Sequence, residues 1–343
     1  MRRRRPIFSI FIMLGNECNL NCKYCIQHVM VNEMTPHGIN KDLVSYIKRI
    51  ADRQNHPLKI MFYGGEPLIW FEDIKKYAKE LESYVNFAVI TNGKLLDEEK
   101  IDFLNEFNIG AGVSYDGKNS KITRGYDVLE DKYGLLLKIN SLSFSGVIST
   151  YNYPKDWLDN LEDFAQDYVK KHNMFVGTNL DLLMNNNNLD NLNNFDMSKI
   201  RTQMIELCDI YYQNQISKKE NVFSDTFIKD LLNMSNNKPN IKNYGKCGNG
   251  ITVQNIDADG DMYLCHNSRI KIGNLSTTRE EMTKKCLDMY KPKLHCEKCN
   301  VLSYCGGGCM LSTQEDLDSY YCELTKNMYE PVKELYEKLK ETN

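Results

Sequence analysis

Short apolar runs alternate with amphipathic segments through the first half of the chain, and this alternation constrains the fold more than any other feature. Six runs are predicted to be strands: Ile7–Leu14, Leu58–Tyr63, Phe87–Thr91, Ile109–Tyr115, Val147–Thr150 and Phe175–Leu182. The segments between them are predicted to be helices: Lys41–Arg53, Phe71–Ser83, 97–107, Tyr126–Ile139 and Pro154–Lys171. Successive parallel strands need a long crossover, which a helix supplies, so the repeat predicts an α/β protein with a parallel sheet. A doubly wound sheet and a barrel-like arc both satisfy this pattern.

The second half of the chain has a different character. An Asn-rich stretch at Asn185–Asn194 predicts a loop, and two helical patterns follow at Met197–Gln215 and Ser224–Met234. A hairpin is predicted from Ile251–Ile256 and Met262–Leu264, with its turn at Asp259–Gly260. A helix is expected from about Lys326 to Lys340. These patterns predict a sheet domain over 1–183, a helical linker over 184–243, a cysteine-rich domain over 244–325 and a closing helix over 326–343.

Unusual loops follow four of the predicted strands. They are Cys18–Cys25, Gly64–Pro67, Asn92–Gly93 and Asp116–Gly117. In parallel α/β folds the functional residues lie at the carboxyl ends of the strands, so we expect these loops to meet at one site.

Composition limits the class of protein. The chain has 343 residues, twelve cysteines and a formal net charge of −3. This balance indicates neither a nucleic-acid partner nor an acidic substrate. The basic and apolar start resembles a signal peptide, but no small-residue cleavage site follows. No run of 18 apolar residues is present. We therefore expect a cytoplasmic protein without a membrane partner, whose cysteines bind metal rather than form disulfides.

Three cysteines lie close together after the first strand, at Cys18, Cys22 and Cys25. Thiolates suit both iron–sulfur clusters and zinc. Structural zinc takes four protein ligands, and His28 could supply the fourth. Three thiolates on a four-iron cluster would instead leave one iron open for a small molecule. The spacing alone leaves both alternatives open.

The segment Cys18-Asn-Leu-Asn-Cys22-Lys-Tyr24-Cys25 resembles the signature of the radical S-adenosylmethionine (radical SAM) superfamily. Three later loops also match that family in order: Gly64-Gly65-Glu66-Pro67, Thr91-Asn92-Gly93 and Ser114-Tyr115-Asp116-Gly117. The resemblance implies a partial (β/α)6 TIM-like barrel over about residues 7–182 and a [4Fe–4S] cluster that binds S-adenosylmethionine. It implies that Glu66 faces the methionine ammonium and that Ser114 contacts the ribose or methionine end. Arg124 is either a contact to the cofactor carboxylate or an ordinary surface arginine.

Seven further cysteines occupy the C-terminal part: Cys247, Cys265, Cys296, Cys299, Cys305, Cys309 and Cys322. By spacing alone, a pair of zinc ribbons is an equal alternative. Behind a radical SAM core, the pattern resembles the SPASM extension, which carries two auxiliary iron–sulfur clusters. The resemblance implies an outer cluster on Cys296, Cys299, Cys305 and Cys322. It implies an inner cluster on Cys247, Cys265 and Cys309, which leaves one position short of a ligand. Cys286, a non-cysteine ligand and an open iron are equal alternatives for that position. Cys208 falls in a helical pattern and is predicted to be a core thiol.

Relatives with this extension commonly oxidise peptides or proteins. The resemblance therefore implies a maturase that forms a crosslink in a ribosomal precursor peptide, with flavodoxin or ferredoxin as electron donor. Formylglycine formation of the sulfatase-maturase type, and dehydrogenation of a small molecule, are the alternatives. A non-catalytic metal-binding protein is a further one. The sulfatase-maturating branch usually has an acid after the second hairpin cysteine. His266 stands there in this chain and is either a proton acceptor or a structural residue.

Overall fold

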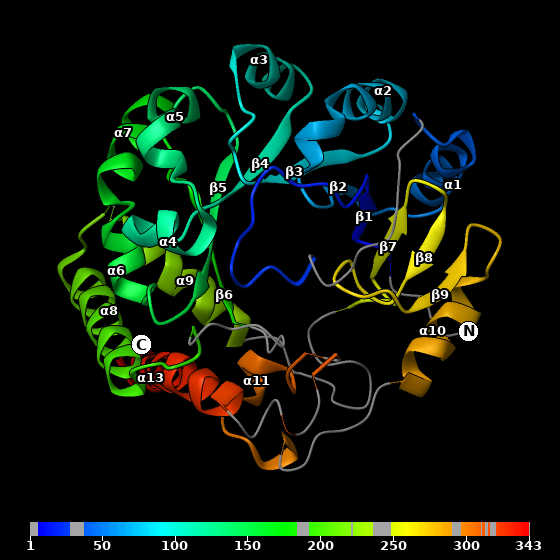
Figure 1. The fold of residues 1–343 in the computed structure, drawn as a ribbon. Coiled ribbons are helices and arrows are strands. Elements are labelled where there is room, and N and C mark those ends of the chain that lie inside the picture. Colours follow the sequence, from blue (N-terminus) through cyan, green and yellow to red (C-terminus); the bar gives the residue numbers. More distant parts are fainter. Residues whose placement is uncertain are drawn as a thin grey trace.

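A computed structural model describes residues 6–27, 38–183, 192–220, 222–235, 248–289, 296–309, 311–312, 315 and 320–342. Its strands form a single curved sheet in the order β6-β5-β4-β3-β2-β1-β7-β8-β9, with most helices around the outside (Figure 1). The parallel strands of the first half are β1 (Ser9–Met13), β2 (Lys59–Tyr63), β3 (Asn86–Thr91), β4 (Ile109–Ser114), β5 (Leu142–Ile148) and β6 (Gly177–Leu182). The prediction of an α/β fold with a parallel sheet is confirmed.

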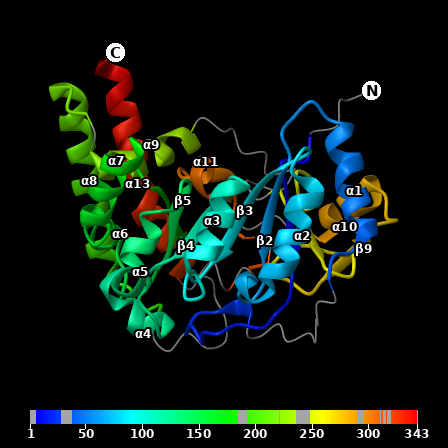
Figure 2. The same cartoon turned by 90° about the horizontal axis from the view of Figure 1, so that it is seen from above.

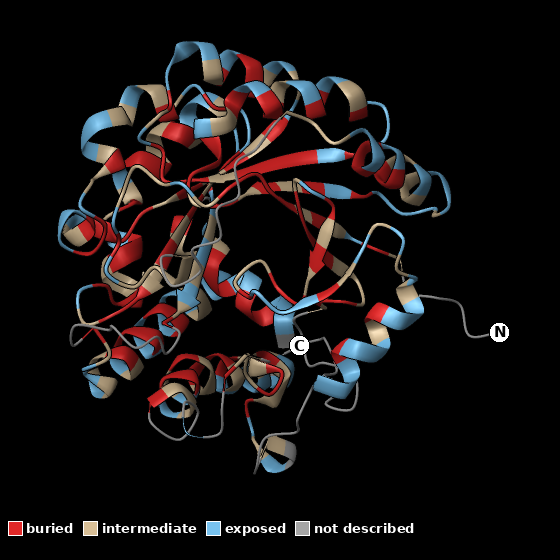
Figure 3. Cartoon of the chain, turned by 45° about the vertical axis from the view of Figure 1, so that its right-hand side comes forward, coloured by how far each residue is buried: buried red, intermediate tan, exposed pale blue. Residues whose placement is uncertain are grey.

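The helices that connect these strands have clear local causes. They are α1 (Lys41–Asp52), α2 (Phe71–Leu81), α3 (Glu98–Glu106), α4 (Ser120–Arg124), α5 (Val128–Leu136), α6 (Pro154–Asp159) and α7 (Glu162–His172). The side chain of Asn40 accepts hydrogen bonds at the start of α1, and Asp97 does the same for α3. In α1 the apolar stripe containing Leu43 and Ile47 is fully buried. Figure 3 shows buried strands surrounded by helices whose outer faces are exposed.

Two predictions in the first half need correction. The fifth strand begins at Leu142, five residues before the predicted start, because serines alternate with Leu142 and Phe144 and hide the apolar run. The helix predicted over Pro154–Lys171 is two helices, α6 and α7. Asn160 caps the first of them, and the chain turns there before α7 begins.

The C-terminal half adds strands to the same sheet. The predicted hairpin is present as β7 (Val253–Asp257) and β8 (Asp261–Tyr263), and β9 (Lys271–Asn274) follows. β7 pairs in parallel with β1, so the sheet continues across the boundary placed between the sheet domain and the cysteine-rich domain. That division of the chain stays a prediction. The helix α10 (Arg279–Met289), which the sequence did not predict, follows β9.

Helices from the second half lie beside the β6 end of the arc and along its open side (Figure 1). They are α8 (Met197–Ser217), α9 (Phe223–Ser235), α11 (Leu302–Cys305) and α13 (Cys322–Thr342). α13 packs against α8 and α9, and its first turn brings Cys322 near α11 (Figure 1; Figure 2 gives the view from above). Cys208, on α8, is buried in the core as predicted. None of the described helices is long and apolar enough to cross a membrane.

Candidate active site

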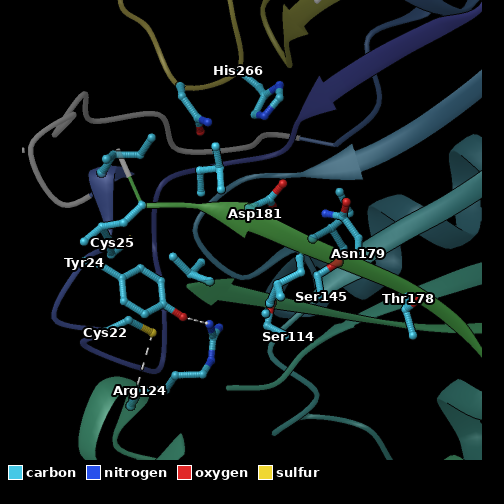
Figure 4. Close-up of a pocket in the computed structure, with 18 of the residues that line it drawn as sticks. Cys22, Tyr24, Cys25, Ser114, Arg124, Ser145, Thr178, Asn179, Asp181 and His266 are labelled. Atoms are coloured by element: carbon cyan, nitrogen blue, oxygen red, sulfur yellow. Dashed lines mark hydrogen bonds between the residues drawn. The ribbon is translucent and has the colours of Figure 1, made fainter. Parts of the chain in front are cut away.

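A cavity of about 600 Å³ lies at the carboxyl ends of the parallel strands. The predicted site residues that line it are Cys18, Cys22, Tyr24, Cys25, Gly64, Gly65, Thr91, Asn92, Ser114, Arg124, His266 and Cys305. They come from loops far apart in the sequence, and Figure 4 shows several of them around the same space. The structure therefore brings the first cysteine loop, residues of all three later motifs and one C-terminal cysteine to a single cavity.

The loop that carries the first cysteines is held from two sides. Asn92 Nδ2, at the end of β3, lies 2.7 Å from Asn19 Oδ1 and 3.8 Å from Cys18 Sγ. On the other side the backbone N–H of Lys23 donates to the carbonyl of Thr123 at 2.9 Å. Burial raises the pKa of Cys22 to about 11, and nearby Arg124 opposes this shift. The three thiols are thus fixed in one partly buried loop that faces the cavity.

Tyr24 is part of a buried polar group beneath these cysteines. Its hydroxyl donates to Asp116 Oδ2 at 2.6 Å. The same hydroxyl accepts a hydrogen bond from Arg124 Nη1 (Figure 4). Thr123 also donates to Asp116 Oδ2, at 2.8 Å, and the N–H of Val147 donates to Oδ1 at 3.1 Å. Arg124 is buried, so the surface-arginine alternative is wrong. Asp116 does not line the cavity, and its carboxylate holds Tyr24 and Arg124 in place.

The Gly64–Pro67 loop lies directly against the first cysteine loop. The N–H groups of Gly65 and Glu66 donate to the carbonyls of Gly15 and Glu17, each at 2.8 Å. A Cβ on Gly65 would come within 2.2 Å of the Glu17 carbonyl oxygen, so only glycine permits this approach. Gly64 and Gly65 face the cavity, whereas Glu66 is fully buried.

The carboxylate of Glu66 accepts three hydrogen bonds from groups within the protein. Oε1 accepts from Thr91 Oγ1 at 2.7 Å and from the N–H of Leu68 at 3.0 Å, and Oε2 accepts from the N–H of Asn92 at 2.8 Å. Burial raises the pKa of Glu66, and these hydrogen bonds oppose the shift. The contact of Glu66 with an ammonium stays a prediction. The geometry shows that Glu66 joins two of the cavity loops, and that Pro67 is buried behind them.

His266 stands at the opposite wall of the cavity. Its ring stacks on Phe11, with centroids 4.3 Å apart, and meets the edge of Tyr63 at 4.6 Å. Its Nδ1 lies 3.3 Å from Asn255 Oδ1. Burial lowers the pKa of His266 to about 4, so the ring is neutral near pH 7. Its role as proton acceptor stays a prediction, and the aromatic packing gives it a clear structural role.

A second, smaller cavity of about 30 Å³ lies beside α11. Four of the C-terminal cysteines line it: Cys296, Cys299, Cys305 and Cys322. Gly307 and Gly308 line it too, with positive φ angles that let the backbone wrap closely around the space. These are the four residues predicted for the outer cluster, and Cys305 also faces the large cavity. No three Cys, His, Asp or Glu side chains in the described part of the chain are gathered tightly enough for a single metal ion.

The inner set is described only in part. Cys265 is buried at the end of the hairpin, and Cys309 is half-buried. Cys286 is buried on α10 against Gly250, where an added Cβ would lie 2.3 Å from its sulfur. Cys247 and His28 lie outside the described residues, so the inner ligand set and the zinc alternative with His28 stay predictions.

Several cavity residues were missed by the sequence reasoning. Ser145, Asn179 and Asp181 project into the cavity from β5 and β6 (Figure 4). The signal was available, because polar side chains alternate at the carboxyl ends of these two strands. Gln27 joins the loop of Cys18–Cys25 to the turn after Cys265. No sequence motif marks Gln27.

Residues 12–181 match the model of the radical SAM superfamily. The chain therefore carries a radical SAM domain and is a radical SAM enzyme, as the cysteine signature predicted. The domain match runs from β1 to β6 and contains the loops that surround the cavity.

Among curated proteins, the chain is 24% identical to the radical SAM cyclopropyl synthase TigE of Paramaledivibacter caminithermalis, over 93% of this chain and 72% of that protein. It is 26% identical to a cysteine-type anaerobic sulfatase-maturating enzyme of Clostridium perfringens, over 95% of this chain and 96% of that enzyme. These two similarities extend through the cysteine-rich C-terminal half.

Two solved structures share the fold. One is anSMEcpe with bound AdoMet and the Cp18Cys peptide, with a TM-score of 0.71, 19% identity and coverage of 99% of this chain and 100% of that one. The other is Streptococcus suis SuiB bound to its precursor peptide SuiA, with a TM-score of 0.61, 17% identity and coverage of 89% and 72%.

Proposed function

We propose that this enzyme cleaves S-adenosylmethionine reductively and uses the resulting radical to oxidise a peptide or protein substrate. The observation that carries the proposal is that one cavity is lined both by Cys18, Cys22 and Cys25 and by Cys305 of the C-terminal cysteine group. A radical formed at one wall and an electron acceptor at the other suit a net oxidation.

The residues present fit the implied cofactors. Cys18, Cys22 and Cys25 would hold a [4Fe–4S] cluster with one iron open, because soft thiolates are its usual ligands. Cys296, Cys299, Cys305 and Cys322 would hold an auxiliary cluster around the smaller cavity. When bound, the first cluster supplies the electron that splits S-adenosylmethionine into methionine and a 5′-deoxyadenosyl radical.

Residues of the protein itself would bind S-adenosylmethionine and orient it in the cavity. Gly64 and Gly65 leave room for close backbone approach, and Thr91 and Asn92 fix the neighbouring loop. Ser114 offers a hydroxyl on the cavity floor, and buried Arg124 offers a positive charge for a cofactor carboxylate. C-terminal helices α11 and α13 cover the cavity and limit the access of water to a reactive radical.

A peptide substrate is supported by the names of the relatives. The solved structures named above contain peptides, and the curated relatives are named as a cyclopropyl synthase and as a sulfatase-maturating enzyme. We propose a ribosomal precursor peptide and a crosslink-type oxidation as the main reaction, with flavodoxin or ferredoxin as electron donor. Formylglycine formation and small-molecule dehydrogenation are the alternatives that the experiment separates.

The experiment starts with the cofactor reaction. Protein reconstituted anaerobically with iron and sulfide should convert S-adenosylmethionine to 5′-deoxyadenosine when dithionite is added. Replacing Cys18, Cys22 and Cys25 together by Ala should abolish this product while iron bound to the C-terminal half remains. Cys208→Ala, a core thiol far from these loops in sequence, is the matched control and should keep both. Absence of 5′-deoxyadenosine from the unmodified enzyme would overturn the proposal.

The second stage identifies the substrate class. A panel of synthetic Cys- or Ser-containing sulfatase-type peptides and short precursor-type peptides is incubated with the active enzyme and analysed by mass spectrometry. A crosslink and formylglycine made from Ser both remove two hydrogens, so each product is also treated with an aldehyde-selective hydrazide. Loss of two hydrogens without reaction with the hydrazide indicates a crosslink, and a hydrazide adduct indicates the sulfatase reaction. Production of 5′-deoxyadenosine with no peptide altered would favour the small-molecule alternative.

A further inference from the structure

The wall of the large cavity formed by β4, β5 and β6 carries a row of polar side chains. Strand register places Ser114 beside Ser145, and Ser145 beside Asn179. All three line the cavity. Asp181 is two residues beyond Asn179 on the same face of β6, about 7 Å further towards the carboxyl end of the sheet. Asp181 is therefore the acidic group at the outer end of this polar row.

Asp181 differs from the other carboxylates around this site. Glu66 accepts three hydrogen bonds from inside the protein, and Asp116 is likewise held by Tyr24, Thr123 and Val147. Asp181 faces the open cavity, and Asn179 on its own strand stabilises its charged form. Within the described residues it forms no ion pair. Apart from the hydrogen bond with the Asn179 side chain, its carboxylate is therefore available to a substrate.

Asp181 lines the same cavity as Cys25 of the first cysteine group and Cys305 of the C-terminal group. The pKa of Tyr63 is raised mainly by burial, and then by the charges of Cys25, Cys265 and Asp181. The pKa of Tyr321 is raised mainly by burial, with Cys305, Cys309 and Asp181 contributing. Tyr63 and Tyr321 line the cavity as Asp181 does, so the charge of Asp181 acts on the same side chains as the thiols of the two cysteine groups. Asp181 would therefore accept the proton from a substrate bound in the cavity that both cysteine groups line.

We propose that Asp181 contacts the substrate and accepts the proton that it loses during oxidation. This inference rests on the proposed function and deepens it by naming a catalytic residue. Burial by the surrounding protein raises the pKa of Asp181 above its ordinary value, although its side chain stays open to the cavity. A carboxylate with a raised pKa is a stronger base, closer to what proton transfer near neutral pH needs.

The step balances in atoms and electrons. The substrate first loses a hydrogen atom from carbon to the 5′-deoxyadenosyl radical, which becomes 5′-deoxyadenosine. A second group of the substrate, X–H, then loses its proton to a carboxylate oxygen of Asp181. One electron passes to an auxiliary iron–sulfur cluster, and a carbon–X bond forms. Two bonds to hydrogen break, one bond forms, and the substrate is oxidised by two electrons.

His266 is the alternative base that the sequence suggested. It is neutral near pH 7, but it is packed between Phe11 and Tyr63 and directly follows a predicted metal ligand. The other acid in the cavity is Asp230 on α9, beside Lys229. The other titratable groups that line the cavity with Asp181 are Cys18, Cys22, Tyr24, Cys25, Tyr63, Arg124, Asp230, His266, Cys305, Tyr321 and Tyr329.

The test compares Asp181→Asn, Asp181→Glu and Asp230→Asn in the reconstituted enzyme, with the peptide converted by the unmodified protein as probe. Asp209→Asn, an exposed acid on α8, is the matched control. In Asp181→Asn we expect 5′-deoxyadenosine formation within a few-fold of the unmodified enzyme, but about a hundredfold less oxidised peptide per 5′-deoxyadenosine. Asp181→Glu should restore part of the product and shift its pH profile. Iron content and circular dichroism confirm that each variant is folded and loaded.

A second readout needs no turnover. Infrared difference spectra between unmodified enzyme and Asp181→Asn should show a carboxyl band that titrates above the ordinary range of aspartate and is ionised at the pH where product forms. The proposal is overturned if Asp181→Asn keeps the normal ratio of product to 5′-deoxyadenosine, or if only Asp230→Asn loses it. A wild type that makes no 5′-deoxyadenosine would defeat the proposed function itself. If the unmodified enzyme turns over normally and Asp181→Asn does so too, only this inference is overturned.

Discussion

Gln27 Nε2 donates a hydrogen bond to Asn267 Oδ1 at 2.8 Å, and it lies 3.0 Å from the carbonyl oxygen of His266. Gln27 is two residues after Cys25, and Asn267 is two residues after Cys265. Tyr63 Oη lies 3.3 Å from the same Asn267 oxygen. The loop of the radical SAM cysteines is thereby joined directly to the turn that carries a predicted ligand of the inner auxiliary cluster.

Gln27→Leu should loosen this connection without removing any cysteine. Losing two hydrogen bonds at a partly buried position should cost about 1–3 kcal/mol of stability. A small displacement of a reactive site lowers rates strongly, so we expect 5′-deoxyadenosine formation to fall about tenfold or more while iron content is unchanged. Urea unfolding and product assays measure the two effects. Gln213→Leu, at an exposed position of α8, is the control; equal behaviour of both variants would contradict the prediction.

Glu66→Gln should destabilise the loops around the cavity. The three groups that donate to Glu66 include two backbone N–H groups, and an amide can accept at only one of its two ends. At least one buried donor then faces another donor, which should cost about 1–3 kcal/mol. Denaturant unfolding of the metal-free protein gives the value. Glu17→Gln, at an exposed neighbouring position, should have almost no effect.

Two glycines provide an opposite pair of predictions. A Cβ on Gly65 would lie 2.2 Å from the Glu17 carbonyl oxygen and 2.4 Å from that of Asn16, and backbone cannot move away easily. Gly65→Ala should therefore cost about 1–3 kcal/mol and weaken S-adenosylmethionine binding. Gly134, inside α5, has nothing within 4 Å of an added Cβ, and Gly134→Ala should stabilise by about 0.5–1 kcal/mol. Thermal unfolding and equilibrium dialysis test both. A neutral Gly65→Ala would refute the close approach.

The contact between α8 and α13 predicts a pH dependence. Glu330 accepts hydrogen bonds from Asn300 Nδ2 at 2.9 Å and from Arg201 Nη1 at 2.7 Å, and these partners lower its pKa. A lower pKa in the folded state means fewer bound protons there. The stabilisation is therefore complete above the unfolded pKa of Glu and is lost as the pH falls through the folded pKa.

Glu330→Gln should accordingly cost about 0.5–1 kcal/mol near pH 7 and almost nothing in strong acid. Urea titrations at several pH values reveal the difference. Glu337→Gln is the control, because its carboxylate is well exposed and lies 3.6 Å from Lys340. A penalty for Glu330→Gln that stays constant with pH would show that the ion pair is not its cause.

Much of the fold could be predicted because it follows from local patterns. Strand–helix alternation predicted β1–β6 and their parallel pairing. Predictions failed where a local pattern was ambiguous, as at β5, whose alternating serines hid an apolar strand face. The parallel pairing of β7 with β1 could not be predicted, because it joins segments some 240 residues apart without a motif that marks them.

By itself the sequence determined the chemistry: three clustered cysteines, the loops after the strands and a cysteine-rich second half identify a radical SAM enzyme, because ligand type and spacing are properties of the chain. Only the tertiary structure decided which residues face the reaction. Glu66 and Asp116 are buried, and their carboxylates hold neighbouring loops in place. His266 stacks on an aromatic ring, whereas Asp181 lines the open cavity. The physical reason is that the availability of a carboxylate depends on burial and on donors brought from distant segments, which no local pattern records.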